Sequence, residues 1–254
     1  MRLDSFLVEN KFYKSRNKAS EGIERGEVFV NGTICEKPST QINLTDVVTL
    51  QREEIPFVSL GGDKLNKAVK CFSPVINGKQ FIDVGASTGG FTDCLLRHGA
   101  KKVYCVDVGE NLLDEKISTD SRVVVMDRTN ARYLTINQFD KAVDGIVVDC
   151  SFISLEYILP PLVPLLDDSG FLLALIKPQF ELQERVKLKN GILRDDNARL
   201  KILKRIYDFS INCGLNPQGI LNVAANKNKN VEYIIYLKKG VSAVTFESLI
   251  RDLK

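Results

Sequence analysis

The stretch FIDVGASTGGFTD, residues 81–93, constrains the fold more than any other part of the sequence. A short apolar run ends in a loop containing Gly85, Gly89 and Gly90, and a helical pattern follows. Glycines between a strand and a helix let the backbone approach a ligand closely. The spacing is not Gly-x-Gly-x-x-Gly, and no Gly-Lys-Ser/Thr follows, so neither the dinucleotide fingerprint nor the P-loop applies. The pattern predicts the first strand–loop–helix unit of an α/β sheet.

Strand and helix patterns alternate beyond this loop. Strands are predicted at 80–84, 102–107, 122–126, 143–149 and 170–177, and helices at 64–72, 90–98, 154–165 and 196–212. This alternation predicts a parallel sheet with helices on both faces. Two further strand patterns, 216–225 and 231–237, are separated by a polar turn, which predicts an antiparallel hairpin at the end of the sheet. A short helix, 244–253, closes the chain.

Acidic residues follow three successive strands. Asp83, Asp107 and Asp127 each stand at the carboxyl end of a predicted strand, the edge where open α/β sheets bind ligands. A carboxylate in the second position accepts hydrogen bonds from ribose hydroxyls. The alternative is that acids and glycines simply favour such turns. Three acids together with the glycines favour a nucleoside-type cofactor.

The glycine loop and the three acids resemble those of the S-adenosylmethionine-dependent methyltransferases. That resemblance implies a Rossmann-like seven-stranded sheet whose last strand is antiparallel. It also implies a cofactor site: the methionine part would contact Asp83, Gly85, Ser87, Thr88 and Gly89, the ribose would contact Asp107, and the adenine would lie near Asp127.

The first fifty residues have a different pattern. Leu3, Phe6 and Leu7 lie at helical spacing, and Ser15 is placed to cap a second helix that ends before Gly26. Asn31-Gly32 between β-branched flanks predicts a hairpin. The segment 11–18, KFYKSRNK, contains four cations and no acid, which is typical of a solvated helix face or of a phosphate-binding surface.

This segment resembles the S4 RNA-binding domain. The resemblance rests on Arg2-Leu3-Asp4, Ser15-Arg16, Ala19, Ile23, Gly26, Val28, Val30-Asn31-Gly32 and Lys37-Pro38-Ser39. It implies a small α+β domain that contacts structured RNA. The implied contact residues are Arg2, Lys14, Arg16, Lys18 and Arg25. The predicted division is therefore an S4-like domain at 1–51, a linker at 52–62 and a methyltransferase domain at 63–254.

Four ionisable residues are predicted to meet at the carboxyl edge of the sheet: Lys64, Asp149, Lys177 and Glu232. Taken one at a time, each is better explained by a surface salt bridge or a snorkelling lysine. Methylation of a hydroxyl needs a base within reach of its proton, and such a cluster could supply one. The Asn/Asp-Pro-Pro-aromatic stretch that accompanies methylation of base amines is absent. Cys150 is better explained as a buried spectator than as a nucleophile.

The order Lys-Asp-Lys-Glu resembles the tetrad of FtsJ-like ribose 2′-O-methyltransferases, in which Lys177 would be the general base. GGDKL, DVGASTGGFTD, VDVGENLL, DRTNAR, VVDCSFISL, LIKPQFE and NVEYIIYL together resemble the hemolysin-like TlyA family. The resemblance implies methylation of a cytidine ribose in ribosomal RNA, and the chain's start at the S4 pattern favours the large subunit. Leu60 stands where that family commonly has arginine.

Bulk properties limit the alternatives. The net charge of +3 gives no strong global attraction to nucleic acid, so RNA contacts must be local. Six scattered cysteines form no metal-binding spacing, and no signal peptide or apolar run of about 20 residues is present. We therefore expect a cytoplasmic protein with no metal and no membrane partner. Nothing in the sequence specifies an oligomeric state.

The expected partners are ribosomal RNA or ribosomal subunits. Further RNA contacts are expected from two basic segments of the large domain: Arg185, Lys187 and Lys189, and Arg199, Lys201, Lys204 and Arg205. Two other functions stay open: an RNA-binding ribosome assembly factor with an inactive methyltransferase domain, and, less favoured, a membrane-lytic hemolysin.

Overall fold

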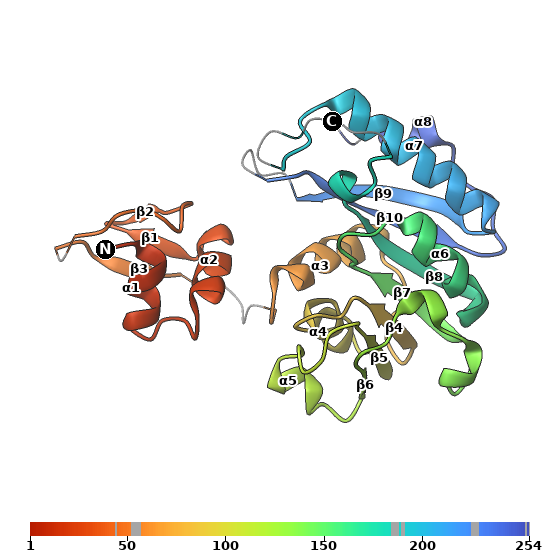
Figure 1. Cartoon of the computed structure of the whole chain (residues 1–254), viewed down its shortest axis with the longest axis horizontal. Coiled ribbons are helices and arrows are strands. Elements are labelled where there is room, and N and C mark those ends of the chain that lie inside the picture. The colour runs from red at the N-terminus through yellow and green to blue at the C-terminus, as the bar shows by residue number, and fades with distance from the viewer. Residues whose placement is uncertain are drawn as a thin grey trace. The chain divides into compact units, whose positions relative to one another are not determined.

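The computed structural model describes residues 1–43, 45–51, 57–183, 188, 191–224, 229–251 and 253. The chain forms two compact units, Met1–Leu60 and Gly61–Lys254 (Figure 1). Part of the predicted linker, 52–56, lies outside the described residues, and the description resumes at Phe57.

The first unit packs two helices against a small antiparallel sheet. Its elements are α1 (Leu3–Glu9), α2 (Arg16–Glu24), β1 (Val28–Val30), β2 (Thr33–Ile34) and β3 (Val48–Leu50), and the strand order is β2-β1-β3. The core is formed by Leu3, Leu7, Ala19, Ile23, Val28, Cys35 and Ile42. Ser15 caps α2 by accepting a hydrogen bond from the Lys18 backbone N–H at 3.3 Å, as predicted. Asn31 and Gly32 both have positive φ in the β1–β2 turn, so the predicted hairpin is confirmed.

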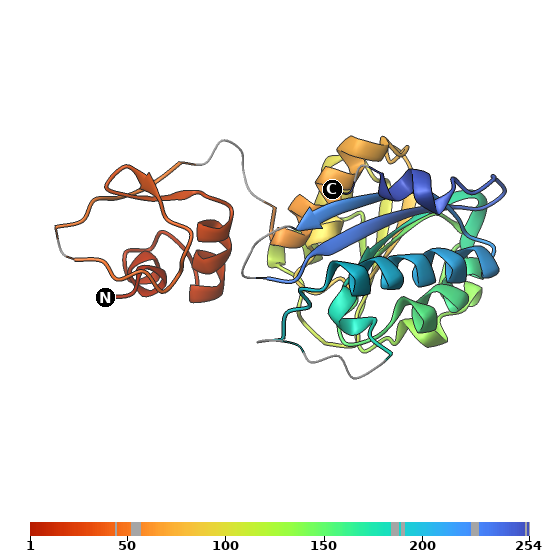
Figure 2. The same cartoon turned by 90° about the horizontal axis from the view of Figure 1, so that it is seen from above.

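The second unit is a seven-stranded sheet between two layers of helices (Figure 2). Its strands are β4 (Gln80–Val84), β5 (Lys102–Val106), β6 (Val123–Met126), β7 (Val143–Val148), β8 (Leu166–Ile176), β9 (Asn216–Ala224) and β10 (Glu232–Lys238). The order is β6-β5-β4-β7-β8-β10-β9. The last strand, β10, runs antiparallel to both neighbours, which confirms the predicted seven-stranded architecture.

The helices of this unit are α3 (Leu60–Phe72), α4 (Gly90–Arg97), α5 (Glu115–Ser118), α6 (Leu155–Leu162), α7 (Asp196–Asn212) and α8 (Phe246–Ile250). Helices α3 and α4 lie over one face of the sheet, and α6 and α7 lie over the other. Short 3₁₀ turns occur at Ala131–Tyr133, Ile136–Gln138, Val163–Leu165 and Pro178–Phe180. The buried faces of β4, β7, β8 and β10 supply much of the core between these layers.

Three predicted elements differ from the structure. Helix α3 begins at Leu60 and not at residue 64, so its first turn lies inside the range predicted as linker, because Gly61 and Gly62 obscured the helical pattern. Strand β8 begins at Leu166 and not at residue 170, because the exposed polar residues 167–169 interrupt the apolar pattern while the backbone is already paired. The register between β7 and β8 shifts between Val143 and Gly145, so the extra residues of β8 form a bulge. The last helix covers only Phe246–Ile250, shorter than the predicted 244–253.

Among the residues that the structure describes, no helix combines the length and apolar character needed to cross a bilayer.

Candidate active site

Strand β8 delivers Lys177 to the carboxyl edge of the sheet, where it meets Asp149 from the end of β7. Lys177 Nζ lies 2.5 Å from Asp149 Oδ1, and the two side chains are 11% and 21% exposed. Pro178 follows at once, has no N–H for the ladder and begins a 3₁₀ turn. The strand therefore ends with its ammonium group held against one carboxylate and still within reach of a ligand.

A second ion pair lies beside the first. Lys64 from α3 contacts Glu232 from the start of β10, with Nζ and Oε2 2.7 Å apart. The last paired position between β8 and β10 is Ile176 with Tyr233, so the next residue outward on each strand is Lys177 and Glu232. The four residues predicted as a tetrad thus occur as two neighbouring ion pairs, and their catalytic roles stay predictions.

Ser151 contacts the same lysine and was not identified from the sequence. Lys177 Nζ donates a hydrogen bond to Ser151 Oγ at 2.9 Å. The only sequence signal for the contact between Ser151 and Lys177 is that Ser151 lies two residues after Asp149. Between them, Cys150, predicted to be a buried spectator, is only partly buried. Desolvation raises the pKa of its thiol to about 12, so the nucleophilic thiolate is scarce at neutral pH, and its role as a spectator stays a prediction.

The glycine loop follows β4 and packs directly against the end of β7. Gly85 has φ +80°, and a Cβ added there would lie 2.7 Å from the Asp149 backbone oxygen. Gly89 has φ +90° and precedes α4, where an added Cβ would meet Leu113 and Ile117. Ser87 also takes a positive φ, 49°. Position 85 therefore requires glycine for both conformation and space, and position 89 requires it for its backbone conformation.

Asp107 and Asp127 organise the loops that follow β5 and β6. Asp107 accepts hydrogen bonds from the Ser87 backbone N–H on Oδ2 and from the Gly109 backbone N–H on Oδ1, both at 2.8 Å. Asp127 Oδ2 accepts one from the Asn111 backbone N–H at 2.9 Å. Each carboxylate oxygen keeps further acceptor capacity, so these bonds are compatible with ligand hydroxyl groups.

Asp83 is the most unusual acid of the set because it is fully buried. Its Oδ2 accepts a 2.6 Å hydrogen bond from the Thr92 hydroxyl, while Oδ1 has no hydrogen-bond partner among the described residues. Burial raises the pKa of Asp83 to about 7, and the charges of Asp149 and Asp107 act in the same direction. A buried carboxylate oxygen without a partner is costly, so this site is suited to a donor or cation supplied by a ligand.

Phe152 is the most exposed large apolar side chain near these groups. It is 88% exposed and has φ +64°, a conformation that bulky residues rarely adopt. Its ring packs against that of Phe180, with centroids 4.7 Å apart. Because Phe180 lies three residues after Lys177, the two rings form an aromatic surface beside the ion pairs. The sequence motif alone did not identify it, since exposure is a tertiary property.

Glu181 ties the two loops of this aromatic pair together. Its Oε2 accepts from the Ser154 hydroxyl at 2.6 Å, its Oε1 accepts from the Leu155 backbone N–H at 2.9 Å, and Arg205 Nη2 lies 3.3 Å away. Burial raises the pKa of this carboxyl. The turn after β7 and the turn after β8 are therefore fastened to each other by one buried group.

The predicted RNA-contact residues of the first unit have three kinds of environment. Arg2 and Arg16 both pair with Asp4. Lys18 contacts Glu21 and the Val58 carbonyl oxygen, while Arg25 contacts Glu27 and the Phe57 carbonyl oxygen, so both cations serve the fold of this unit. Lys14 is exposed.

Among the basic residues predicted in the large unit, Arg205 pairs with Glu156 and Glu181, Arg199 with Asp196, and Lys204 with Asp208. Lys201 is exposed. Arg185, Lys187 and Lys189 lie outside the described residues. In the described part of the chain, no three His, Cys, Asp or Glu side chains are arranged to hold a metal ion.

Two family models match the chain. The FtsJ-like methyltransferase family matches residues 57–239, and the S4 domain matches residues 1–48. Together they cover both units of the structure.

Individual proteins are similar over most of the chain. The Bacillus subtilis protein YqxC, provisionally named as an rRNA methyltransferase, is 42% identical over 93% of this chain and 85% of its own. A Mycobacterium tuberculosis protein named 16S/23S rRNA (cytidine-2′-O)-methyltransferase TlyA is 36% identical over 93% of this chain and 89% of its own. A solved structure from Streptococcus thermophilus, titled as a hemolysin, has a TM-score of 0.74 at 36% identity and covers 96% of this chain and 90% of its own.

Asp83 predicts a pH dependence of stability. Its pKa is raised to about 7 in the folded chain, against ~3.9 when unfolded, so the folded state binds the proton more tightly. The free energy of unfolding should therefore fall as pH rises from about 4 to about 7. Asp83→Asn should remove this slope and stabilise the ligand-free protein at pH 8 by on the order of 1–2 kcal/mol. Urea denaturation at pH 5 and pH 8 measures both.

A matched control is Asp144→Asn. The Gln80 backbone N–H and Lys79 hold the pKa of Asp144 below its usual range despite partial burial, so this variant should lose stability at pH 8. Identical pH profiles for wild type and Asp83→Asn would contradict the assignment.

Proposed function

The chain belongs to the hemolysin-like TlyA family of FtsJ-like methyltransferases, and on that premise we propose that it methylates the ribose 2′-hydroxyl of a cytidine in ribosomal RNA. The methyl donor in this proposal is S-adenosylmethionine. The observation that carries it is the Lys177–Asp149 ion pair, set beside Lys64–Glu232 at the edge where the glycine loop also ends. An M. tuberculosis relative bears the name of this reaction.

The site has the features that S-adenosylmethionine requires. Gly85 leaves the space next to β7 that a Cβ would fill, and Asp83 offers a buried carboxylate oxygen without a partner. Asp107 and Asp83 place carboxyl oxygens at this edge, and a ligand that carries a sulfonium and an ammonium group would favour the ionised form of Asp83, whose pKa is raised to about 7. When bound, this cofactor supplies an electrophilic methyl group on positively charged sulfur.

Lys177 acts as the general base in this proposal. In its neutral form, Nζ accepts the proton of the 2′-hydroxyl while the oxygen forms its bond to the methyl carbon. The donor would supply the methyl group, and the electron pair of its carbon–sulfur bond would leave with S-adenosylhomocysteine. Asp149 and Ser151 fix the direction of the amine, and Lys64 with Glu232 orients the hydroxyl. Much of the rate enhancement then comes from positioning.

The aromatic surface of Phe152 and Phe180 suits a nucleobase. A base stacked on an aromatic side chain contributes roughly 1–3 kcal/mol of binding. A nucleotide inside folded RNA must leave its helix to reach a catalytic pocket, and such a surface holds it once extruded. We therefore propose that Phe152 stacks on the target base or on its neighbour.

The proposed substrate is RNA within a ribosomal subunit, with the large subunit favoured and the small subunit as the second target. The S4 domain supports RNA binding, and the name of the M. tuberculosis relative includes both subunits. Incubation with labelled S-adenosylmethionine and unmodified 50S or 30S subunits, followed by mapping of 2′-O-methyl sites, tests the proposal. Label confined to bases would refute it. If the protein does not bind the cofactor, the result would instead support an RNA-binding assembly factor. If the protein releases dye from liposomes, the result would support a membrane-lytic protein.

The base assignment predicts different results for two substitutions of Lys177. Lys177→Met removes the proton acceptor and should lower kcat by roughly 100- to 10,000-fold. Lys177→Arg keeps a cation opposite Asp149 but stays protonated, so it should be about as inactive. Single-turnover methyl transfer gives the rate, and calorimetry with S-adenosylhomocysteine should show cofactor binding near that of the wild type.

The matched control for Lys177 is Lys79→Met. Lys79 also pairs with an aspartate, Asp144, but at the amino edge of the sheet, so its loss should leave kcat unchanged. Substantial activity in Lys177→Arg would show that this lysine works through its charge and not as a base.

The stacking surface predicts a graded series at Phe152. Phe152→Tyr keeps an aromatic face and should retain activity. Phe152→Leu and Phe152→Ala should raise KM for the subunit by about 5- to 100-fold, because roughly 1–3 kcal/mol of stacking is lost. Steady-state kinetics with subunits measures this. If Phe152→Leu has the same KM for the subunit as Phe152→Tyr, then Phe152 contributes an apolar contact and not aromatic stacking.

A further inference from the structure

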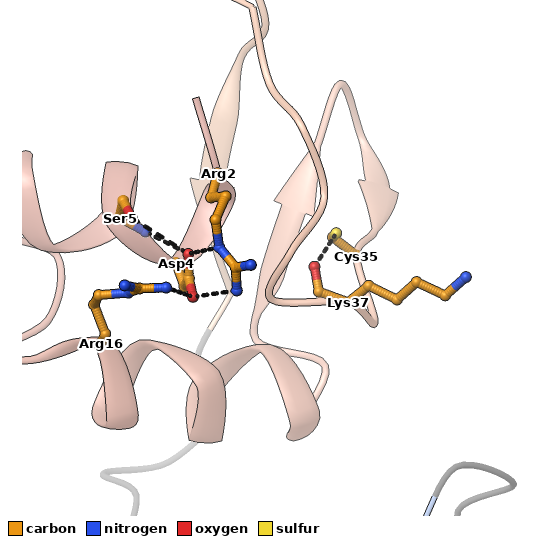
Figure 3. Close-up of polar contacts among 6 residues, drawn as sticks. All are labelled: Arg2, Asp4, Ser5, Arg16, Cys35 and Lys37. Atoms are coloured by element: carbon orange, nitrogen blue, oxygen red, sulfur yellow. Dashed lines mark hydrogen bonds and ion pairs between the residues drawn. The ribbon is translucent and has the colours of Figure 1, made fainter.

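In the first unit, one buried aspartate holds two arginines, one from the residue that precedes α1 and one from α2. Asp4, in the first turn of α1, accepts hydrogen bonds from Arg2 Nε on Oδ1 at 3.0 Å and from Arg2 Nη2 on Oδ2 at 2.9 Å. Arg16, the first residue of α2, donates from Nη2 to the same Oδ2 at 2.8 Å. Figure 3 shows both guanidinium groups converging on this single carboxylate.

Burial differs sharply within this cluster. The Asp4 side chain is only 4% exposed, whereas those of Arg2 and Arg16 are 45% and 57% exposed. The backbone also fixes the carboxylate, because the Ser5 backbone N–H donates a hydrogen bond to Asp4 Oδ1 at 2.8 Å. The adjoining Leu3 is fully buried. The anion therefore belongs to the interior, and the two cations form the surface above it.

The hydrogen-bond count leaves both arginines with donors to spare. A guanidinium has five N–H groups; Arg2 uses two of them on Asp4 and Arg16 uses one. Two positive charges face one negative charge, so the cluster keeps a net positive charge. The hydrogen bonds from Arg2 and then Arg16 hold the pKa of Asp4 well below its usual range, so the carboxylate stays ionised throughout the neutral range.

Other cations of this unit lack this arrangement. Lys18 and Arg25 are less exposed, at 31% and 13%, and each contacts a backbone carbonyl oxygen of residues 57–58. Only the pair on Asp4 combines fixed position, exposure and remaining donors in the part of this unit that the structure describes. Two neighbouring guanidinium groups match the oxygens of a phosphodiester, which arginine binds through paired N–H groups.

We propose that Asp4 is a positioning residue that holds Arg2 and Arg16 as one clamp for a backbone phosphate of the RNA substrate. This inference rests on the proposed function, because it takes RNA to be the substrate. Without Asp4, two exposed arginines would repel each other and sample many rotamers, and binding would have to order both. Asp4 holds both arginine side chains in one arrangement before RNA binds, so binding does not have to order them.

The direction in which one substitution changes the affinity for RNA tests the clamp. Asp4→Asn adds one unit of positive charge, so attraction to RNA by net charge alone would tighten binding. The clamp predicts the opposite: affinity for unmodified 50S subunits falls roughly tenfold, and the slope of log K against log salt shrinks by about one. Full-length protein without cofactor is titrated at several salt concentrations, and circular dichroism melting confirms the fold.

Glu9→Gln is the matched control. Glu9 lies on the same helix and is exposed. Glu9→Gln changes the net charge by the same amount as Asp4→Asn, so the affinity of this variant for 50S subunits should equal or slightly exceed that of the wild type. In steady-state methylation, Asp4→Asn should raise KM for the subunit and leave kcat at saturation unchanged. A purely structural role for Asp4 would lower the melting temperature without this selective change.

A second variant keeps the test decisive if Asp4→Asn fails to fold. Replacing both arginines by lysine keeps the charges and the pairing to Asp4 but removes the planar paired donors, and should also weaken binding roughly tenfold. Wild-type affinity in Asp4→Asn, or in the double lysine variant, overturns the clamp. Wild-type protein that binds no ribosomal RNA would instead overturn the proposed function, so the two failures are distinguishable.

Discussion

The burial of a carboxylate at the carboxyl edge of the sheet is the constraint on which the site of the large unit depends. Asp83, Asp107 and Asp149 end three neighbouring parallel strands, and parallel strands bring their carboxyl ends to one side. Asp83 is fully buried, and its pKa is raised to about 7 by burial and by its two acidic neighbours. In the proposed function, a cationic ligand bound beside these carboxylates would offset this cost.

The remaining groups at this edge are organised by pairing. Asp149 holds Lys177, Glu232 holds Lys64, and Glu181 fastens together the turns that carry Phe152 and Phe180. Each pair joins segments far apart in the chain, so the position of the lysine amine is set by the sheet and not by its own flexible side chain. Partial burial of Cys150 and the neighbouring charge of Asp149 raise the pKa of its thiol to about 12.

The two units use carboxylates for opposite purposes. In the large unit, acids outnumber the nearby cations around the glycine loop, and the excess is negative. In the small unit, Asp4 is outnumbered by Arg2 and Arg16, and the excess is positive and exposed. A cofactor that carries positive charge and an RNA strand that carries negative charge would each meet the complementary surface. The overall charge of +3 conceals this separation.

The amino-acid sequence by itself determined the class of fold, most strand positions and the identity of the charged residues at strand ends. Periodicity and glycine spacing carry that information because they reflect local backbone requirements, as at Gly85 and Asn31-Gly32. Resemblance to known families added the grouping of Lys64, Asp149, Lys177 and Glu232. Only the tertiary structure decided how they pair, that Ser151 joins them, that Asp83 is left with a partnerless oxygen, that Phe152 is exposed, and that Arg2 and Arg16 share one carboxylate. These properties depend on burial and on contacts between distant segments, which no local pattern encodes.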